Sequence, residues 1–216
     1  MTVEEITGDG VHGWLHRPDG DVLGGLAFAH GAGGDAGSAL LVALAEAFAE
    51  RGVLTLRYDL PYRQRRPKGP PQPARAEADR AGVAAALEVV RELFDGPLVA
   101  GGQSYGGRQT SMLLAEQPGL IDRLTLTGLL LTSYPLHAPG KPDKQRTEHL
   151  PDLRVPTVVV HGSKDTFATT DEIERALALI PAPTTLVDIA GGRHDLAPGK
   201  SDVVARAAEA GLRLFE

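Results

Sequence analysis

The chain has 216 residues, a length that suits one domain, since domains cluster near roughly 100–200 residues. Its hydrophobic share of 42% and charged share of 23% exclude a disordered protein and permit a sizeable core. The net charge of −6 excludes the basic footprint of proteins that bind nucleic acids or anionic membranes. The absence of cysteine excludes disulfides, thiolate catalysis and cysteine-ligated zinc.

The ends and the hydropathy of the chain bear on its location. The N-terminus, Met1–Glu5, is acidic and lacks the apolar region of a signal peptide. No apolar run approaches the roughly 18 residues that a membrane span requires. We therefore expect a cytoplasmic protein whose residues 1–216 form a single domain.

Gly and Pro divide the chain into alternating strands and helices. Val11–Arg17 and Val22–His30 flank the turn Pro18–Asp21 and predict an antiparallel hairpin. The pattern then predicts, in chain order, helix Ala39–Arg51, strand Val53–Tyr58, helix Ala74–Phe94, strand Pro97–Gly101, helix Tyr105–Glu116, strand Leu124–Leu131, strand Thr157–His161, helix Thr170–Leu179, strand Thr184–Ile189 and helix Asp202–Phe215.

Apolar strands that alternate with helices indicate an α/β fold. Parallel strands need long crossovers, so we expect a mostly parallel central sheet with helices on both faces and an antiparallel N-terminal hairpin. Ligands of open α/β sheets bind at the carboxyl ends of the strands. The long connection Thr132–Pro156 is rich in Pro and charge and has no strong periodicity of apolar residues, and loops of that length are usually functional or disordered.

One motif lies at such a strand end. Gly102, Ser104 and Gly106 form G-x-S-x-G between a predicted strand and a predicted helix, where a nucleophile elbow must lie. The turn holds the serine in a strained conformation, and side chains at the glycines would collide with the neighbouring strand and helix. Ser104 is therefore the candidate nucleophile.

A serine hydroxyl needs a base and an orienting acid before it attacks a carbonyl. Asp165 follows strand Thr157–His161, and His194 lies in a Gly-containing loop after the last strand. The order serine, acid, histidine matches this architecture. We therefore predict a triad of Ser104, Asp165 and His194.

Other titratable residues compete for these roles. Asp195 adjoins the histidine, but adjacent side chains in a loop point differently, so Asp165 is preferred. His12 and His16 lie on the early hairpin and are expected to be solvated. His161 ends a strand and is expected to be packed rather than catalytic.

An oxyanion hole requires preorganised N–H donors. One donor is expected to be the backbone amide of Tyr105, directly after the nucleophile. The other is expected in the HGAGG loop His30–Gly34, where we select the amide of Ala32.

Over nearly its whole length the chain resembles an α/β-hydrolase. The similarity is carried by His30–Gly34, by Gly102–Arg108, by the Asp165 and His194 loops, and by three further segments. These are Leu56–Tyr62, Tyr134–Pro142 and Arg146–Leu150. The last two belong to one long stretch in the middle of the chain, and that stretch is the most specific part of the similarity. The branch it resembles most is lid-less and dienelactone-hydrolase-like, and includes bacterial proteins and the testis-expressed and chromatin-complex-associated hydrolase-like proteins of animals. The resemblance implies this fold and a serine hydrolase, but no substrate.

Two features depart from that branch. The cysteine nucleophile of true dienelactone hydrolases is absent, and Asp195 stands where relatives often carry a small residue.

Two loops at the same sheet edge carry positive charge in an otherwise acidic protein. They are Tyr62–Lys68 and Ser133–Pro156, and their charge favours a carboxylate or phosphate on the substrate, although solvated surface loops would look the same. The substrate-binding candidates are His137, Lys141, Arg146 and His149.

Three functions follow from these residues. The first is a hydrolase of small carboxyl esters, thioesters or lactones, whose partner is a small-molecule acyl substrate and which needs no metal or organic cofactor. The second is a non-catalytic interaction protein of the same fold, and the third an acyltransferase or peptidase on the same triad. Fold alone does not decide among them.

Overall fold

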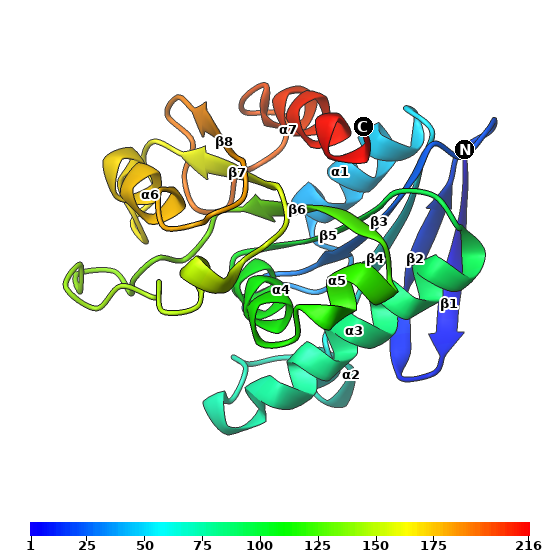
Figure 1. The fold of residues 1–216 in the computed structure, drawn as a ribbon, viewed down its shortest axis with the longest axis horizontal. Coiled ribbons are helices and arrows are strands. Elements are labelled where there is room, and N and C mark those ends of the chain that lie inside the picture. Colours follow the sequence, from blue (N-terminus) through cyan, green and yellow to red (C-terminus); the bar gives the residue numbers. More distant parts are fainter.

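The computed structural model describes all 216 residues and contains one eight-stranded sheet with helices on both faces (Figure 1). The spatial order of the strands is β1-β2-β4-β3-β5-β6-β7-β8. Their bounds are Thr2–Gly8 (β1), Val11–Arg17 (β2), Gly24–Ala29 (β3), Val53–Tyr58 (β4), Leu98–Gln103 (β5), Leu126–Thr132 (β6), Thr157–Gly162 (β7) and Thr184–Ile189 (β8). The pairs β1–β2 and β2–β4 are antiparallel and all the others are parallel, which confirms the predicted mostly parallel sheet.

The predicted hairpin partner was wrong. β2 pairs with β1 rather than with β3, around a two-residue turn in which Asp9 and Gly10 have φ of 50° and 78°. An Asp-Gly pair with positive φ at both residues is the preferred tight turn between antiparallel strands. β3 instead lies between β4 and β5, because all six of its residues are buried and it needs a neighbour on each side.

Seven α-helices flank the sheet. They are Ala39–Ala49 (α1), Pro61–Arg65 (α2), Ala76–Leu93 (α3), Tyr105–Glu116 (α4), Gly119–Arg123 (α5), Thr170–Leu177 (α6) and Val203–Leu212 (α7). Helices α1 and α7 cover one face, and α3, α4 and α5 cover the other (Figure 1). The sequence did not predict α2 and α5, since five residues are too few to show a helical period. No helix combines the length and apolarity needed to cross a membrane.

The period of two along each strand divides the core between the two faces. On β3, Leu26 and Phe28 pack toward α1 and α7, whereas Ala27 and Ala29 pack toward α3 and α4. The other central strands divide their residues in the same way. The sheet is therefore fixed from both sides, and the loops at its carboxyl edge are held at defined positions.

Candidate active site

The turn between β5 and α4 holds Ser104 in an unusual backbone conformation. Its φ is 49° and its ψ is −115°, a region that non-glycine residues avoid and that costs on the order of 1–3 kcal/mol. The flanking backbones are too close for side chains: a Cβ at Gly102 would lie 2.6 Å from the nitrogen of Gly107, and one at Gly106 would lie 2.4 Å from the His30 carbonyl oxygen. The predicted strain and the reason for the glycines are thus confirmed.

The structure brings the three predicted side chains into one hydrogen-bonded chain. Ser104 Oγ lies 2.9 Å from Nε2 of His194, and Nδ1 of the same imidazole lies 2.8 Å from Asp165 Oδ2. The Asp165 side chain is fully buried, whereas 27% of the His194 side chain is exposed. These distances fit a serine that donates its proton to a histidine oriented by a carboxylate.

Backbone contacts between the acid loop and the histidine loop fix the second of these hydrogen bonds. A Cβ at Gly162 would lie 2.5 Å from the carbonyl carbon of Gly192, so the two loops touch where neither residue has a side chain. The amide of Lys164 donates to the Gly192 carbonyl at 2.8 Å. The glycines of both loops therefore allow Asp165 and His194 to meet, although they are 29 residues apart in sequence.

Phe167 supports both members of that pair, and the sequence analysis missed it. Its ring stacks on the His194 imidazole with centroids 4.0 Å apart, and its amide donates to Asp165 Oδ1 at 2.8 Å. Asp195, the competing acid, is exposed and makes no hydrogen bond to the imidazole; its carbonyl accepts a long bond from Gln103. The geometry therefore favours Asp165 as the orienting acid.

Hydrogen bonds to the preceding carbonyl fix the direction of the Ala32 amide. The Gly31 carbonyl accepts from His30 Nδ1 at 2.8 Å, from the Gly34 amide at 3.1 Å and from the Tyr62 hydroxyl at 3.2 Å. The N–H of a trans peptide points away from its C=O, so the Ala32 N–H points away from these donors. It makes no hydrogen bond within the chain, and a Cβ at Gly31 would lie 3.4 Å from Ser104 Cβ.

The second candidate donor is the amide of Tyr105. This residue begins α4, and amides in the first turn of a helix have no partner within the helix. The N-terminal end of a helix also carries partial positive charge, which favours an oxyanion. Tyr105 directly follows Ser104, and the loop that carries Ala32 approaches Ser104 at Gly31, so the backbone at both candidate amides lies close to the serine.

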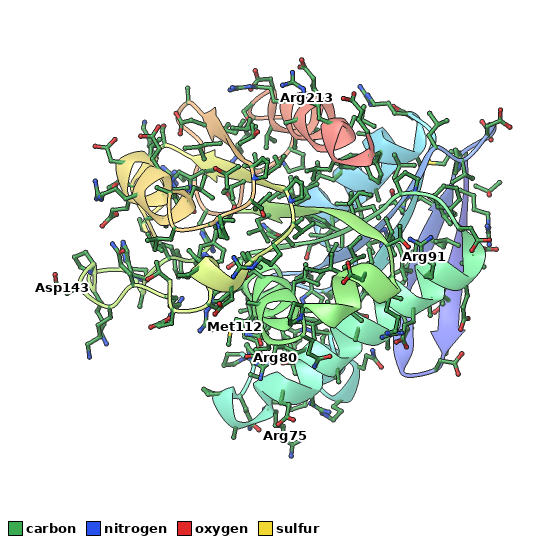
Figure 2. The ribbon with its side chains drawn as sticks, in the orientation of Figure 1. Arg75, Arg80, Arg91, Met112, Asp143 and Arg213 are labelled. Atoms are coloured by element: carbon green, nitrogen blue, oxygen red, sulfur yellow. The ribbon has the colours of Figure 1, made fainter.

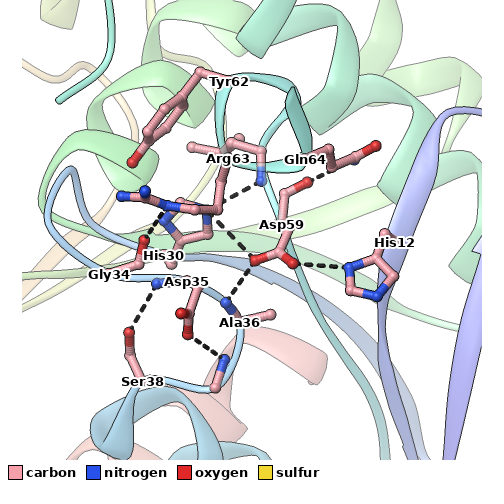
Figure 3. A network of polar contacts seen from close by, with 12 residues as sticks. His12, His30, Gly34, Asp35, Ala36, Ser38, Asp59, Tyr62, Arg63 and Gln64 are labelled. Atoms are coloured by element: carbon pink, nitrogen blue, oxygen red, sulfur yellow. Dashed lines mark hydrogen bonds and ion pairs between the residues drawn. The ribbon is translucent and has the colours of Figure 1, made fainter. Parts of the chain in front are cut away.

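A buried polar network fixes the loop His30–Gly34, which we call the oxyanion loop (Figure 3). Arg63 donates to the carbonyls of Gly34 at 2.8 Å and Ala32 at 3.2 Å. Asp59 accepts from the Ala36 amide at 2.8 Å and lies 2.8 Å from His12 Nδ1, which ties the loop to β2. Arg63 belongs to the Tyr62–Lys68 segment whose charge suggested a substrate role; it is buried and braces the loop instead.

Two histidines in or beside this network are buried and neutral. His30 donates from Nδ1 and accepts the Leu60 amide at Nε2, which defines one tautomer, and burial lowers its pKa. His16 was expected to be solvated; that was wrong. It accepts from Arg57 Nε at 2.8 Å inside the sheet, and burial lowers its pKa to about 4. Helix α1 contacts β2, so the hairpin is not solvated on both of its faces.

His16 makes stability depend on pH. Its folded pKa lies below the usual 6.5, so the stability it provides is complete above pH 6.5 and is lost as the pH falls toward 4. The loss from this residue approaches about 3 kcal/mol, since one pKa unit is worth about 1.4 kcal/mol. Urea unfolding of the wild type and of His16→Gln at pH 7 and pH 4.5 checks this. We expect a smaller pH-dependent loss in the variant; equal losses would contradict the assignment. His12, whose pKa Asp59 raises, acts in the opposite direction in both proteins.

A cleft of about 1250 Å³ opens over the serine. Its walls come from the oxyanion loop, from α3 and α4, from the 135–146 region and from the acid and histidine loops. Figure 2 shows Arg80 of α3 beside Met112 of α4, both of which line the cleft. The cleft is thus bounded in part by the loops that we expected at the carboxyl ends of the strands.

Of the four substrate-binding candidates, the structure brings only Arg146 to the cleft. His137 is buried and faces Glu172 of α6 at 3.4 Å, and His149 lies 2.8 Å from Ser111 Oγ behind α4. Lys141 is exposed and lies two residues before Asp143, which Figure 2 shows at the outer end of the loop. The structure therefore does not bring the other three candidates to the cleft, because charge along a loop does not reveal which side chains turn inward.

Comparison with known proteins places this geometry in a family. The family model described as an alpha/beta hydrolase domain matches residues 24–210. The chain belongs to the alpha/beta-hydrolase family. The expected fold is thereby confirmed, and the protein is a hydrolase by family.

Solved structures with low sequence identity share the fold over almost their whole length. A dienelactone hydrolase from Anabaena variabilis is 20% identical, with a TM-score of 0.73 and coverage of 99% of this chain and 96% of that one. A serine hydrolase without a lid from Xanthomonas campestris is 18% identical, with a TM-score of 0.73 and coverage of 98% and 93%. Est1E from Butyrivibrio proteoclasticus, solved with ferulic acid, is 17% identical, with a TM-score of 0.74 and coverage of 98% of both chains. These likenesses agree with the lid-less, dienelactone-hydrolase-like fold expected from the sequence.

Proposed function

We propose that this hydrolase is a serine enzyme that cleaves a small carboxyl ester, thioester or lactone through an acyl-enzyme intermediate. The observation that carries the proposal is the continuous hydrogen-bonded chain from Ser104 Oγ through His194 to the buried Asp165. A hydroxyl that only stabilised the turn would not need an oriented imidazole behind it.

In the proposed reaction, each step uses one of these groups. The Ser104 oxygen attacks the carbonyl carbon while His194 Nε2 takes the hydroxyl proton, and the amides of Ala32 and Tyr105 stabilise the oxyanion. The alcohol or thiol leaves with the proton from His194. Water then attacks the acyl-serine by the same route and releases the acid.

Trapping the intermediate tests this proposal. Acid quenching during turnover of 4-nitrophenyl butyrate, followed by mass spectrometry, should show one butyryl group on the peptide that contains Ser104. Release of butyric acid in the presence of an added alcohol separates a hydrolase from an acyltransferase. Turnover with an acyl group on another residue would overturn the assignment.

We expect acyl chains of up to about six carbons to be preferred. The four apolar residues of the 133–156 connection that could have lined a long groove lie in the core instead; they are Tyr134, Leu136, Leu150 and Leu153. A longer chain would forgo about 0.8 kcal/mol for each methylene left in water. A series of 4-nitrophenyl esters from four to twelve carbons measures this, and a kcat/KM that rises throughout would reveal an apolar channel.

A further inference from the structure

Two arginines line the cleft beside Ser104 without a carboxylate partner. Arg108 lies on α4 and Arg146 lies on the connection after β6, and both contribute to the cleft wall. Neither forms an ion pair. Glu148, a nearby carboxylate, is exposed and is not within ion-pair distance of either guanidinium. Two like charges are therefore held together in a protein whose net charge is −6.

Arg108 lies one helical turn from the nucleophile. Its amide donates to the Ser104 carbonyl at 2.9 Å, which places Arg108 in the first turn of α4. Side chains of a helix lean toward its N-terminus, which in α4 is the end beside Ser104, and both residues line the cleft. Its Nε is buried without a hydrogen-bond partner, and its terminal nitrogens also make no hydrogen bond within the chain. Unlike Nε, the two terminal nitrogens are not fully buried, so they are the donors that an acceptor in the cleft can reach.

Arg146 is held in place by its own loop. Its Nη1 donates to the Pro135 carbonyl at 2.9 Å, and its carbonyl accepts from the Tyr134 hydroxyl at 2.9 Å. Burial and the charge of Arg108 lower the pKa of Arg146. The loop therefore keeps a second guanidinium close to the first, despite the repulsion between them.

The remaining cations differ from this pair. Arg80 also lines the cleft, but it pairs with Glu116 at 2.8 Å. Lys164 and Arg193 are exposed at the rim. Within the cleft, a partly buried and uncompensated positive charge is thus found at Arg108 and Arg146.

We propose that Arg108 and Arg146 form an anion-binding subsite that holds a carboxylate or phosphate group of the substrate a few bonds from the scissile carbonyl. Guanidinium groups bind either oxyanion through paired hydrogen bonds. The subsite rests on the proposed serine hydrolase for its role in catalysis, but its occupation by an anion does not require turnover.

A matched pair of substrates tests the subsite. Mono-4-nitrophenyl adipate carries a free carboxylate, and methyl 4-nitrophenyl adipate has the same chain with that charge masked. We expect Arg108→Gln to lower kcat/KM for the anionic ester about 10- to 100-fold, the worth of a hydrogen bond to a charged group, and to change the neutral ester less than about twofold. Arg146→Gln should act in the same direction. Arg80→Gln is the control and should keep the wild-type ratio of the two esters.

The anion could instead belong to the alcohol part of the ester. A second pair of substrates, 4-carboxyphenyl butyrate and phenyl butyrate, tests this arrangement. Loss of anion preference in Arg108→Gln for either pair supports the subsite. An unchanged ratio for both pairs in both arginine variants would overturn it.

A binding measurement tests the subsite independently of whether Ser104 is the nucleophile. In Ser104→Ala, adipate or inorganic phosphate should raise the thermal midpoint, and adding Arg108→Gln should abolish that rise. A rise with adipate alone assigns a carboxylate, and a rise with phosphate alone assigns a phosphate. A rise that survives Arg108→Gln, or no rise with either anion, would contradict the subsite. Arg108→Gln itself should fold normally, because the guanidinium makes no hydrogen bond in the chain and repels Arg146.

Discussion

Replacing Ser104 with alanine is expected to lower kcat for short 4-nitrophenyl esters by roughly 10⁴-fold or more, because the nucleophile is lost while the oxyanion amides remain. Thermal unfolding should change little. The hydroxyl hydrogen-bonds only with His194, which is partly exposed, and alanine experiences the same backbone strain at φ 49° as serine.

Steady-state kinetics and a thermal melt of the same preparations measure both effects. Ser201→Ala, a serine outside the cleft, is the matched control and should retain wild-type turnover. Wild-type turnover in Ser104→Ala would contradict the triad, and a large fall in its melting temperature would mean that the turn, rather than the chemistry, had been disturbed.

Replacing Asp165 with asparagine is expected to lower kcat by on the order of 10³-fold or more. The carboxylate accepts from His194 Nδ1 at 2.8 Å and from the Phe167 amide at 2.8 Å. An asparagine that donates its NH₂ to Nδ1 selects the other imidazole tautomer, in which Nε2 carries the proton and cannot accept one from serine.

Asp195→Asn is the matched control, since it removes a charge from the adjacent residue. Its side chain is exposed and makes no hydrogen bond to the imidazole, so kcat should change far less. Kinetics of both variants on one ester compare the two acids directly. The reverse order of effects would assign the acid to Asp195.

The sequence predicted the serine, acid and histidine positions because each depends on local chemistry. Gly102 and Gly106 mark a turn that excludes side chains, and Gly162 and Gly192 mark two loops whose backbones touch. Parallel strands end at the same sheet edge, so residues placed just after them come together without any knowledge of packing.

Other features depend on long-range packing and could not be predicted in the same way. β1 has a weak hydrophobic pattern because it is an exposed edge strand, although the Asp-Gly turn at Asp9 was a readable signal for the hairpin. His137 and His149 lie in a charged loop, yet they turn toward α6 and α4. Whether a basic side chain faces the cleft or the core is decided by which carbonyls and carboxylates surround it, and the sequence does not show these.

Labelling with a fluorophosphonate probe tests the central claim most directly, because the probe reacts with a serine activated by an oriented histidine. We expect the wild-type protein to gain one label on the peptide that contains Ser104, at a rate that falls strongly in Asp165→Asn, and no label to form in Ser104→Ala. A wild-type protein that stays unlabelled, or a label that persists in Ser104→Ala, would contradict a serine hydrolase. The first of these outcomes would favour a non-catalytic interaction protein of the same fold.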